Sequence, residues 1–176
     1  LTRLEVPNEV VTSTACPQLK EVVWAGETLS EKTFPFPVRV SRRLSAATVL
    51  VTGTVDPGFL FPTGLTSLDL TLPDAPVELP CLTTLTRLRG LTLNNNRNEP
   101  PLDLSTLTGL TALNTNTPLV SHLPASLVEY AVRLQSNADF SALTNLTSLR
   151  VSLEPDVHVT FPTQLKELHM FGGRLC

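Results

Sequence analysis

The chain has 176 residues, and 13 lysines and arginines against 16 aspartates and glutamates give it a formal net charge of −3. This balance provides no basic field that would attract nucleic acid, and no apolar run approaches the ~20 residues that span a bilayer. We therefore expect neither nucleic-acid binding nor membrane insertion in this segment. Hydrophobic residues make up 41% of the chain and aromatic residues only 5%, which is enough for a core of aliphatic side chains.

The phrase L-x-x-L-x-L, with some substitutions, occurs nine times. Its copies begin, in order, at Leu1, Leu19, Leu44, Leu65, Leu88, Leu110, Leu127, Leu146 and Leu165. Consecutive starts lie 17 to 25 residues apart, a spacing typical of repeat proteins. The third copy is the least regular because Ala47 stands where leucine is expected, and the proline-rich residues 32–40 before it predict an irregular or longer loop.

The fifth copy shows the expected local structure most clearly. Its leucines recur in steps of three that tighten to two, at Leu82, Leu85, Leu88, Leu91 and Leu93. Neither a long amphipathic helix nor a plain strand has this pattern, whereas a coil that turns a corner into a short strand does. The shorter repeats leave about ten residues for the return path, too few for a crossover helix. We therefore expect extended or 3₁₀ returns.

Two sub-patterns carry a resemblance to a known family. Proline stands just before the phrase in CPQLKEVVW, FPTGLTSLDL, LPASLVEYAV and FPTQLKELHM, and leucines extend the phrase backwards in LTTLTRLRGLTL, LSTLTGLTALNT and FSALTNLTSLRV. The chain resembles a leucine-rich-repeat domain over essentially its whole length. The first set is similar to the short repeats of bacterial effectors and some protist surface proteins, and the second to the 22-residue repeats of bacterial adhesins. The family's usual asparagine survives only as Asn96.

The resemblance implies an α/β-type repeat solenoid made mostly of strand and coil. Specifically, it implies a right-handed leucine-rich-repeat superhelix with a parallel sheet on the concave side and extended or 3₁₀ segments on the convex side. We expect one domain over residues 1–176. Solenoids need polar caps at their ends, and neither end of this sequence carries a convincing one, so we expect the domain to be an excerpt of a longer protein.

The sequence offers no chemistry that points to an enzyme. It contains no phosphate-binding glycine loop, no H-E-x-x-H, no C-x-x-C and no G-x-S-x-G. We therefore expect no catalytic residue, no cofactor and no metal site. The histidines fall at different phases of the repeat, and the cysteines stand at unrelated positions: His122, His158, His169, Cys16, Cys81 and Cys176. Free thiols are the simplest interpretation, with a C-terminal cap remnant as the alternative for Cys176.

Alternation along the predicted strands indicates a binding surface. Phases 4 and 6 of the phrase should point inward, so phases 3, 5 and 7 should face outward. The middle copies place threonine and asparagine there, and the last copies add charged residues and an aromatic ring. Arginine and aromatic residues are favoured in binding hot spots. The predicted partner-binding residues are Asp69, Thr71, Thr92, Asn94, Asn114, Asn116, Glu129, Arg133, Arg150, Glu167, His169 and Phe171. The alternative is that threonine simply suits an exposed strand and that the charges keep an open end soluble.

These features favour a non-catalytic protein-recognition or adhesion module that binds a protein partner on its concave face. The composition favours a cell-surface or secreted setting over a cytoplasmic one. A first alternative is the substrate-targeting part of a larger enzyme, such as a ubiquitin ligase effector. A second is a parallel β-helix that acts on polysaccharide, which would need several sheets in every coil and aligned charges across neighbouring coils.

Overall fold

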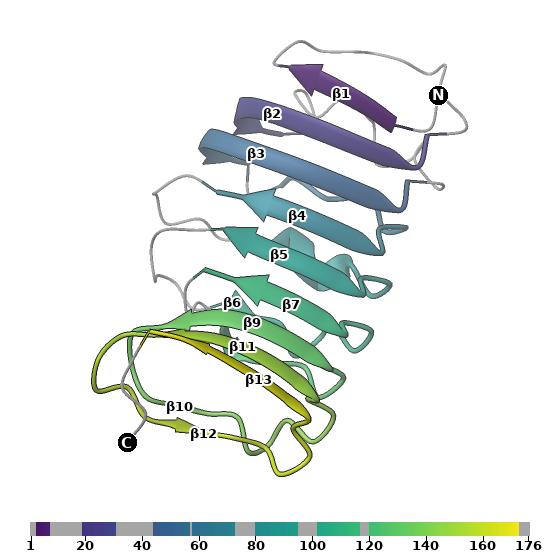
Figure 1. The fold of residues 1–176 in the computed structure, drawn as a ribbon. Helices are drawn as coiled ribbons and strands as arrows, with labels where there is room; N and C mark the ends of the chain where they lie inside the picture. Colours follow the sequence, from purple (N-terminus) through teal and green to yellow (C-terminus); the bar gives the residue numbers. More distant parts are fainter. Residues whose placement is uncertain are drawn as a thin grey trace.

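The computed structural model describes residues 3–7, 19–30, 44–56, 58–72, 80–94, 102–116 and 120–172. In this part of the chain, one nine-stranded parallel sheet runs along the length of the molecule (Figure 1). Its strands, in spatial order, are β1 (Arg3–Pro7), β2 (Glu21–Leu29), β3 (Ala46–Val55), β4 (Ser67–Thr71), β5 (Gly90–Asn94), β7 (Ala112–Thr115), β9 (Glu129–Leu134), β11 (Ser148–Leu153) and β13 (Glu167–Phe171).

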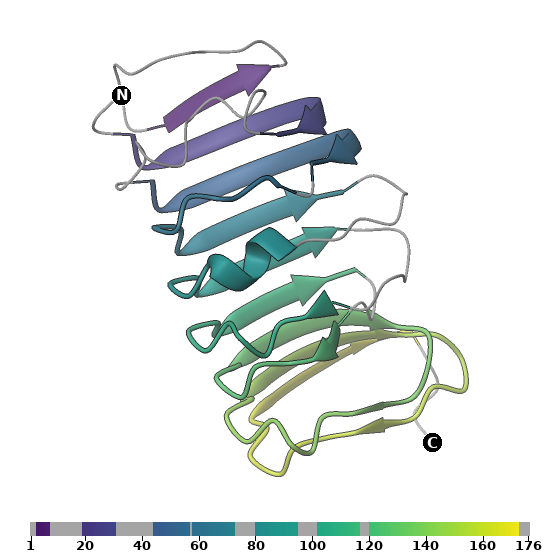
Figure 2. The same cartoon turned by 180° about the vertical axis from the view of Figure 1, so that it is seen from behind.

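The described parts of the return segments lie behind this sheet and carry little regular structure (Figure 2). They contain the 3₁₀ helix η1 (Pro80–Thr84) and four short strands, β6 (Leu102–Asp103), β8 (Val120–His122), β10 (Ala138–Asp139) and β12 (Val159–Thr160). The short strands pair as β6 with β8 and β10 with β12. The predicted fold class, a repeat solenoid of strand and coil with extended or 3₁₀ returns, is therefore confirmed. The return sheets of two or three residues per strand are unlike the several full sheets of a parallel β-helix.

The repeated phrase fixes the register of the large sheet. Every strand of that sheet begins two residues after the start of its copy, as at Leu88 and Gly90. Positions with the same phase consequently stand opposite each other, as Leu68, Leu91 and Leu113 do in β4, β5 and β7. Within the phrase, one apolar surface therefore continues from strand to strand without a shift in register.

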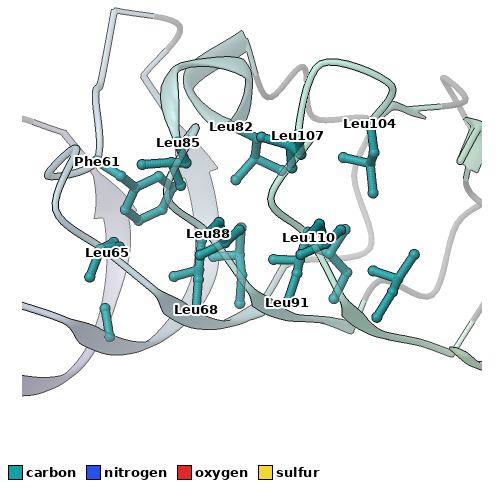
Figure 3. Packing of buried hydrophobic residues seen from close by; sticks show 14 of the residues in the cluster. Phe61, Leu65, Leu68, Leu82, Leu85, Leu88, Leu91, Leu104, Leu107 and Leu110 are labelled. Carbon is teal, nitrogen blue, oxygen red and sulfur yellow. The ribbon is translucent and has the colours of Figure 1, made fainter. Parts of the chain in front are cut away.

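Leucines fill the space between the sheet and the return segments. Figure 3 shows how Leu68 and Leu91, from the sheet side, lie across from Leu85 and Leu107, which come from the returns. All four side chains are buried. The predicted inward phase is confirmed for Leu68, Leu91, Leu113 and Leu149, all of which belong to the buried core. Burial of apolar side chains in the coils from β2 to β11 is the main source of stability in this fold.

Two strands are longer than the short strands that the sequence analysis predicts. β2 has nine residues and β3 has ten, because the alternation of buried and outward residues continues beyond the phrase through β-branched residues such as Val51. The pairing shifts register between Gly26 and Thr28. Gly53 lies close to this irregularity, where a Cβ atom would stand 2.6 Å from the Glu27 carbonyl oxygen. Glycine is therefore required there by the close approach of the two backbones.

The C-terminal coil departs from the prediction that every phase-4 leucine is buried. Leu168 is 41% exposed, whereas Leu149, its partner in β11, is 0% exposed. In the described residues β13 has a strand on one side only, so no further coil covers its inward side chains. The predicted loop at 32–40, Asn96, Cys16, Cys176 and the side chain of Cys81 lie outside the residues whose structure is described.

Candidate functional site

The outward side chains of the sheet stand in three rows, each running across the strands. Row 3, named for the phase in the phrase, contains Ser67, Gly90, Ala112, Glu129, Ser148 and Glu167 in β4 to β13. Row 5 contains Thr48, Asp69, Thr92, Asn114, Ala131, Arg150 and His169 in β3 to β13. Row 7 contains Thr71, Asn94, Asn116, Arg133, Ser152 and Phe171. The sheet thus brings residues from seven coils onto one face.

A shallow hollow of about 430 Å³ lies on this face and extends from β3 to β11. Its outward lining comes from rows 3 and 5, and the buried residues between those rows contribute the remainder. The side chains that project into it are Thr48, Ser67, Asp69, Thr92, Ala112, Asn114, Glu129, Ala131, Ser148 and Arg150, with Gly90 in the middle of the floor. None of the row 7 positions lines the hollow.

Small residues form the floor of the hollow. Gly90, Ala112 and Ala131 come from three neighbouring strands, β5, β7 and β9. A Cβ atom at Gly90 would meet only the Ser67 Oγ, at 3.8 Å, which is an ordinary contact distance. The space above Gly90 is therefore open, and the glycine is not needed for the backbone conformation of β5.

The polar groups in row 5 have unused hydrogen-bonding capacity. Within the described part of the chain, the side chains of Asp69, Thr92, Asn114 and Arg150 make no hydrogen bond and no ion pair. Polar groups that a protein leaves unpaired on a recessed surface can bond to a partner without breaking internal bonds first. Row 5 is therefore the part of the face best prepared for a ligand.

Several polar groups outside the hollow are already paired. In row 7, Asn94 Nδ2 donates to Thr71 Oγ1 at 3.4 Å. Arg133 Nη2 stands 3.4 Å from Glu154 Oε1, which also accepts a bond from Gln135 Nε2 at 3.3 Å. These groups bind neighbouring coils to each other, so part of their bonding capacity is already used within the protein.

The structure therefore divides the twelve predicted binding residues. The hollow brings five of them together: Asp69, Thr92, Asn114, Glu129 and Arg150. Row 7 holds four others beside it, and the last strand, β13, holds Glu167, His169 and Phe171 away from it. The sequence prediction missed the contribution of Thr48, Ser67, Gly90, Ala112, Ala131 and Ser148. The available signal was the run of small residues at phase 3, which leaves room above the strands.

One buried polar pair lies beneath this face. Thr115, at phase 6 of β7, is buried, and its Oγ1 has no hydrogen-bond partner in the described structure. Tyr130 packs edge-on against Phe140 with ring centroids 5.6 Å apart. Burial raises the pKa of Tyr130 to about 12, and a weak interaction with the Thr115 hydroxyl, short of hydrogen-bond geometry, opposes this rise. Both groups belong to the core and cannot contact a ligand.

The described residues contain no cluster of three or more histidine, cysteine, aspartate or glutamate side chains placed to hold a metal ion. His122 and His158 come from the return side, whereas His169 stands on β13. Among the helices of the described segments, none combines the length and apolar character needed to cross a membrane.

The stacked parallel strands and leucine-filled interior define a solenoid of the leucine-rich-repeat type. Among solved structures, the chain is similar to the crystal structure of CroV588, described as a novel circular LRR protein. The similarity has a TM-score of 0.51 at 18% sequence identity and covers 96% of this chain. This chain spans 30% of the length of that protein, so the likeness concerns the fold alone. No protein-family model and no curated protein matches the sequence. The predicted mixture of repeat types stays a prediction.

Proposed function

We propose that this protein is a non-catalytic recognition module that binds a protein partner in the hollow formed by rows 3 and 5. The observation that supports this function most directly is the contrast between paired and unpaired polar groups. Row 5 keeps the capacity of Asp69, Thr92, Asn114 and Arg150 unused inside the hollow, whereas Arg133 in row 7 is held by Glu154. Solenoids commonly bind their partners on an extended surface of this kind.

The spacing of the carboxylates supports a role without catalysis. Asp69 and Glu129 are the two carboxylates that line the hollow, and they stand on β4 and β9. These strands are three steps apart in the sheet, or about 14 Å. Paired carboxylates in glycoside hydrolysis are about 5 to 9.5 Å apart. The pair is therefore too far apart for that kind of acid–base work.

The chemistry of the hollow also favours protein over polysaccharide. No aromatic ring projects into it, since the ring of Tyr130 is buried in the core. Threonine, asparagine and charged groups next to small residues suit the backbone amides and charged side chains of a polypeptide. A flat aromatic platform would instead be expected for stacking against sugar rings.

The proposal is tested by blocking the hollow without disturbing the fold. A double variant, Gly90→Gln with Ala112→Gln, places two neutral side chains over the floor, and the open space at Gly90 accommodates the change. The matched control, Ala25→Gln with Ser152→Gln, puts the same side chains at phase 7 of β2 and β11, in line with row 7 and outside the hollow. Phage displaying random 12-residue peptides are selected on the unmodified chain. The enriched peptides should bind the control but lose at least about tenfold in affinity for the blocked variant, the loss expected when a central contact is removed.

Equal binding to the blocked and control variants would contradict the proposed function. Thermal unfolding of both variants is measured alongside, because a blocked variant that unfolds early would lose binding for a different reason. Binding of immobilised polysaccharide that is lost in the blocked variant, with no peptide enriched, would also contradict recognition of a protein.

A further inference from the structure

The dimensions of the hollow limit the shape of what it can bind. Its outward lining comes from rows 3 and 5 alone, and adjacent outward rows are two residues apart along a strand, or about 7 Å. An α-helix with its side chains is about 10 to 12 Å wide and would have to contact row 7 as well. An extended segment is narrower, because neighbouring strands in a sheet lie only about 4.8 Å apart. The width of the hollow therefore favours an extended segment that crosses the strands.

The charges of the hollow lie at opposite ends of row 5. Asp69 on β4 stands near one end and Arg150 on β11 at the other, with Thr92, Asn114 and Ala131 between them. Neither group forms an ion pair with a described residue. The middle of the row is uncharged, and its threonine and asparagine can bond to the amides of an extended backbone. Row 5 is thus negative near one end, polar in the middle and positive at the other end.

The distance between these charges sets the spacing in the partner. β4 and β11 are four steps apart in the sheet, which corresponds to about 19 Å at 4.8 Å per step. An extended chain rises about 3.4 Å per residue, so about five or six residues cover that distance. A basic side chain over Asp69 and an acidic side chain over Arg150 would thus be five or six positions apart in sequence.

We propose that the hollow binds an extended polypeptide segment that carries one basic and one acidic residue five or six positions apart, with small or polar residues between them. The basic residue pairs with Asp69, and the acidic residue pairs with Arg150. Glu129 projects from row 3 one strand before Arg150. Its negative charge repels the acidic residue of the partner and so keeps that residue on the row 5 side. This inference rests on the proposed function, since it specifies the chemistry of the partner in the same hollow.

The test changes one charge at a time, so that the direction in which a peptide lies does not matter. Random 12-residue peptides are selected separately on the unmodified chain, on Arg150→Glu and on Asp69→Lys. The unmodified chain should enrich one basic and one acidic residue at the stated spacing. Arg150→Glu should enrich two basic residues at that spacing, and Asp69→Lys should enrich two acidic ones. A consensus peptide from the unmodified chain should bind Arg150→Glu about fivefold more weakly, since an exposed ion pair contributes up to about that factor and the new glutamate also repels the acidic residue of the peptide.

The matched control is Arg133→Glu, which makes the same change in row 7, outside the hollow. It should select the same peptides as the unmodified chain. If the selected peptides are blocked by the glutamine pair at Gly90 and Ala112 but show the same charge pattern on all three baits, the proposed function stands and this inference is overturned. If the peptides are not blocked by that pair, the proposed function itself is wrong.

Discussion

Replacing Leu91 by alanine tests the stacked-coil architecture directly. The side chain is 2% exposed and stands in register between Leu68 of β4 and Leu113 of β7. The substitution removes three carbon atoms, worth about 0.8 kcal/mol each when buried, or about 2.4 kcal/mol in total. The cavity left behind adds to this cost when neighbours cannot collapse into it. Because buried residues enclose Leu91 on both sides, we expect a loss of about 3 to 4 kcal/mol in the free energy of unfolding.

Two matched variants separate burial from position in the repeat. Thr92 is adjacent in sequence but faces outward in row 5, so Thr92→Ala should change the free energy of unfolding by no more than about 0.5 kcal/mol. Leu168 has the same phase as Leu91 but is 41% exposed in the last coil, so only about 1.4 kcal/mol is expected for Leu168→Ala, with no closed cavity.

Urea unfolding followed by circular dichroism measures all three variants under the same conditions. Leu91→Ala should have the largest effect on the free energy of unfolding, Leu168→Ala a smaller one and Thr92→Ala almost none. Equal losses at Leu91 and Thr92 would show that the phase assignment is wrong. Equal losses at Leu91 and Leu168 would show that the last coil is covered as fully as the inner ones.

Three further predictions concern the core and the backbone. Thr115→Val removes a buried hydroxyl that has no hydrogen-bond partner and should raise the free energy of unfolding by up to about 1 kcal/mol in urea titrations; a loss of that size would mean that the hydroxyl is bonded. The pKa of Tyr130 is raised from 10.0 to about 12, so its contribution to stability is complete below pH 10 and is lost as the pH rises through 12. This loss amounts to at most about 2 to 3 kcal/mol in the free energy of unfolding. Urea midpoints measured between pH 9 and 12 should show the loss in the unmodified chain and not in Tyr130→Phe. Parallel pH profiles of the two proteins would refute the raised pKa. Gly53→Ala brings a Cβ atom to 2.6 Å from the Glu27 carbonyl oxygen and should lower the free energy of unfolding by about 1 to 3 kcal/mol. The control, Gly90→Ala, should be nearly neutral in thermal unfolding. Equal melting temperatures for the two variants would contradict the close approach at Gly53.

The sequence predicts which side chains face the core because strand geometry leaves little choice. Once the phrase is recognised, the period of two places Leu91 and Leu93 on the inner face and Thr92 on the outer face, and both leucines are buried. Repetition then predicts the register, since identical phases meet when coils of similar length are stacked. For this reason, even the least regular copy keeps the common register, and Ala47 at its phase 4 is buried in β3.

Features that depend on contacts between distant side chains could not be predicted in the same way. The phrase places row 5 and row 7 equally on the outer face, but the structure pairs Arg133 with Glu154 and leaves Arg150 without an ion pair among the described residues. Glu154 follows β11 and is not part of the phrase. The exposure of Leu168 likewise depends on what lies beyond β13, which a local pattern does not contain.

The lengths of β2 and β3 were predictable in principle. Alternation continues through Val49, Val51 and Val55, and β-branched residues favour strands. The prediction of short strands rested on the leucine steps of the fifth copy, where Leu91 and Leu93 end the pattern. The local pattern was the better guide at this end of the sheet.

The pairing of each strand with its neighbouring coil has a consequence for how the protein folds. Strand partners in the large sheet are 17 to 26 residues apart along the chain, as for Asn114 with Ala131 and Thr28 with Thr54. A separation of about 20 residues is small for an all-β protein, and folding rates rise as this separation falls. Each added coil closes a loop of similar length, so ordering can begin at any well-packed pair of coils and spread in both directions. The leucine-rich central coils, β4 to β7, are the natural starting point for this growth.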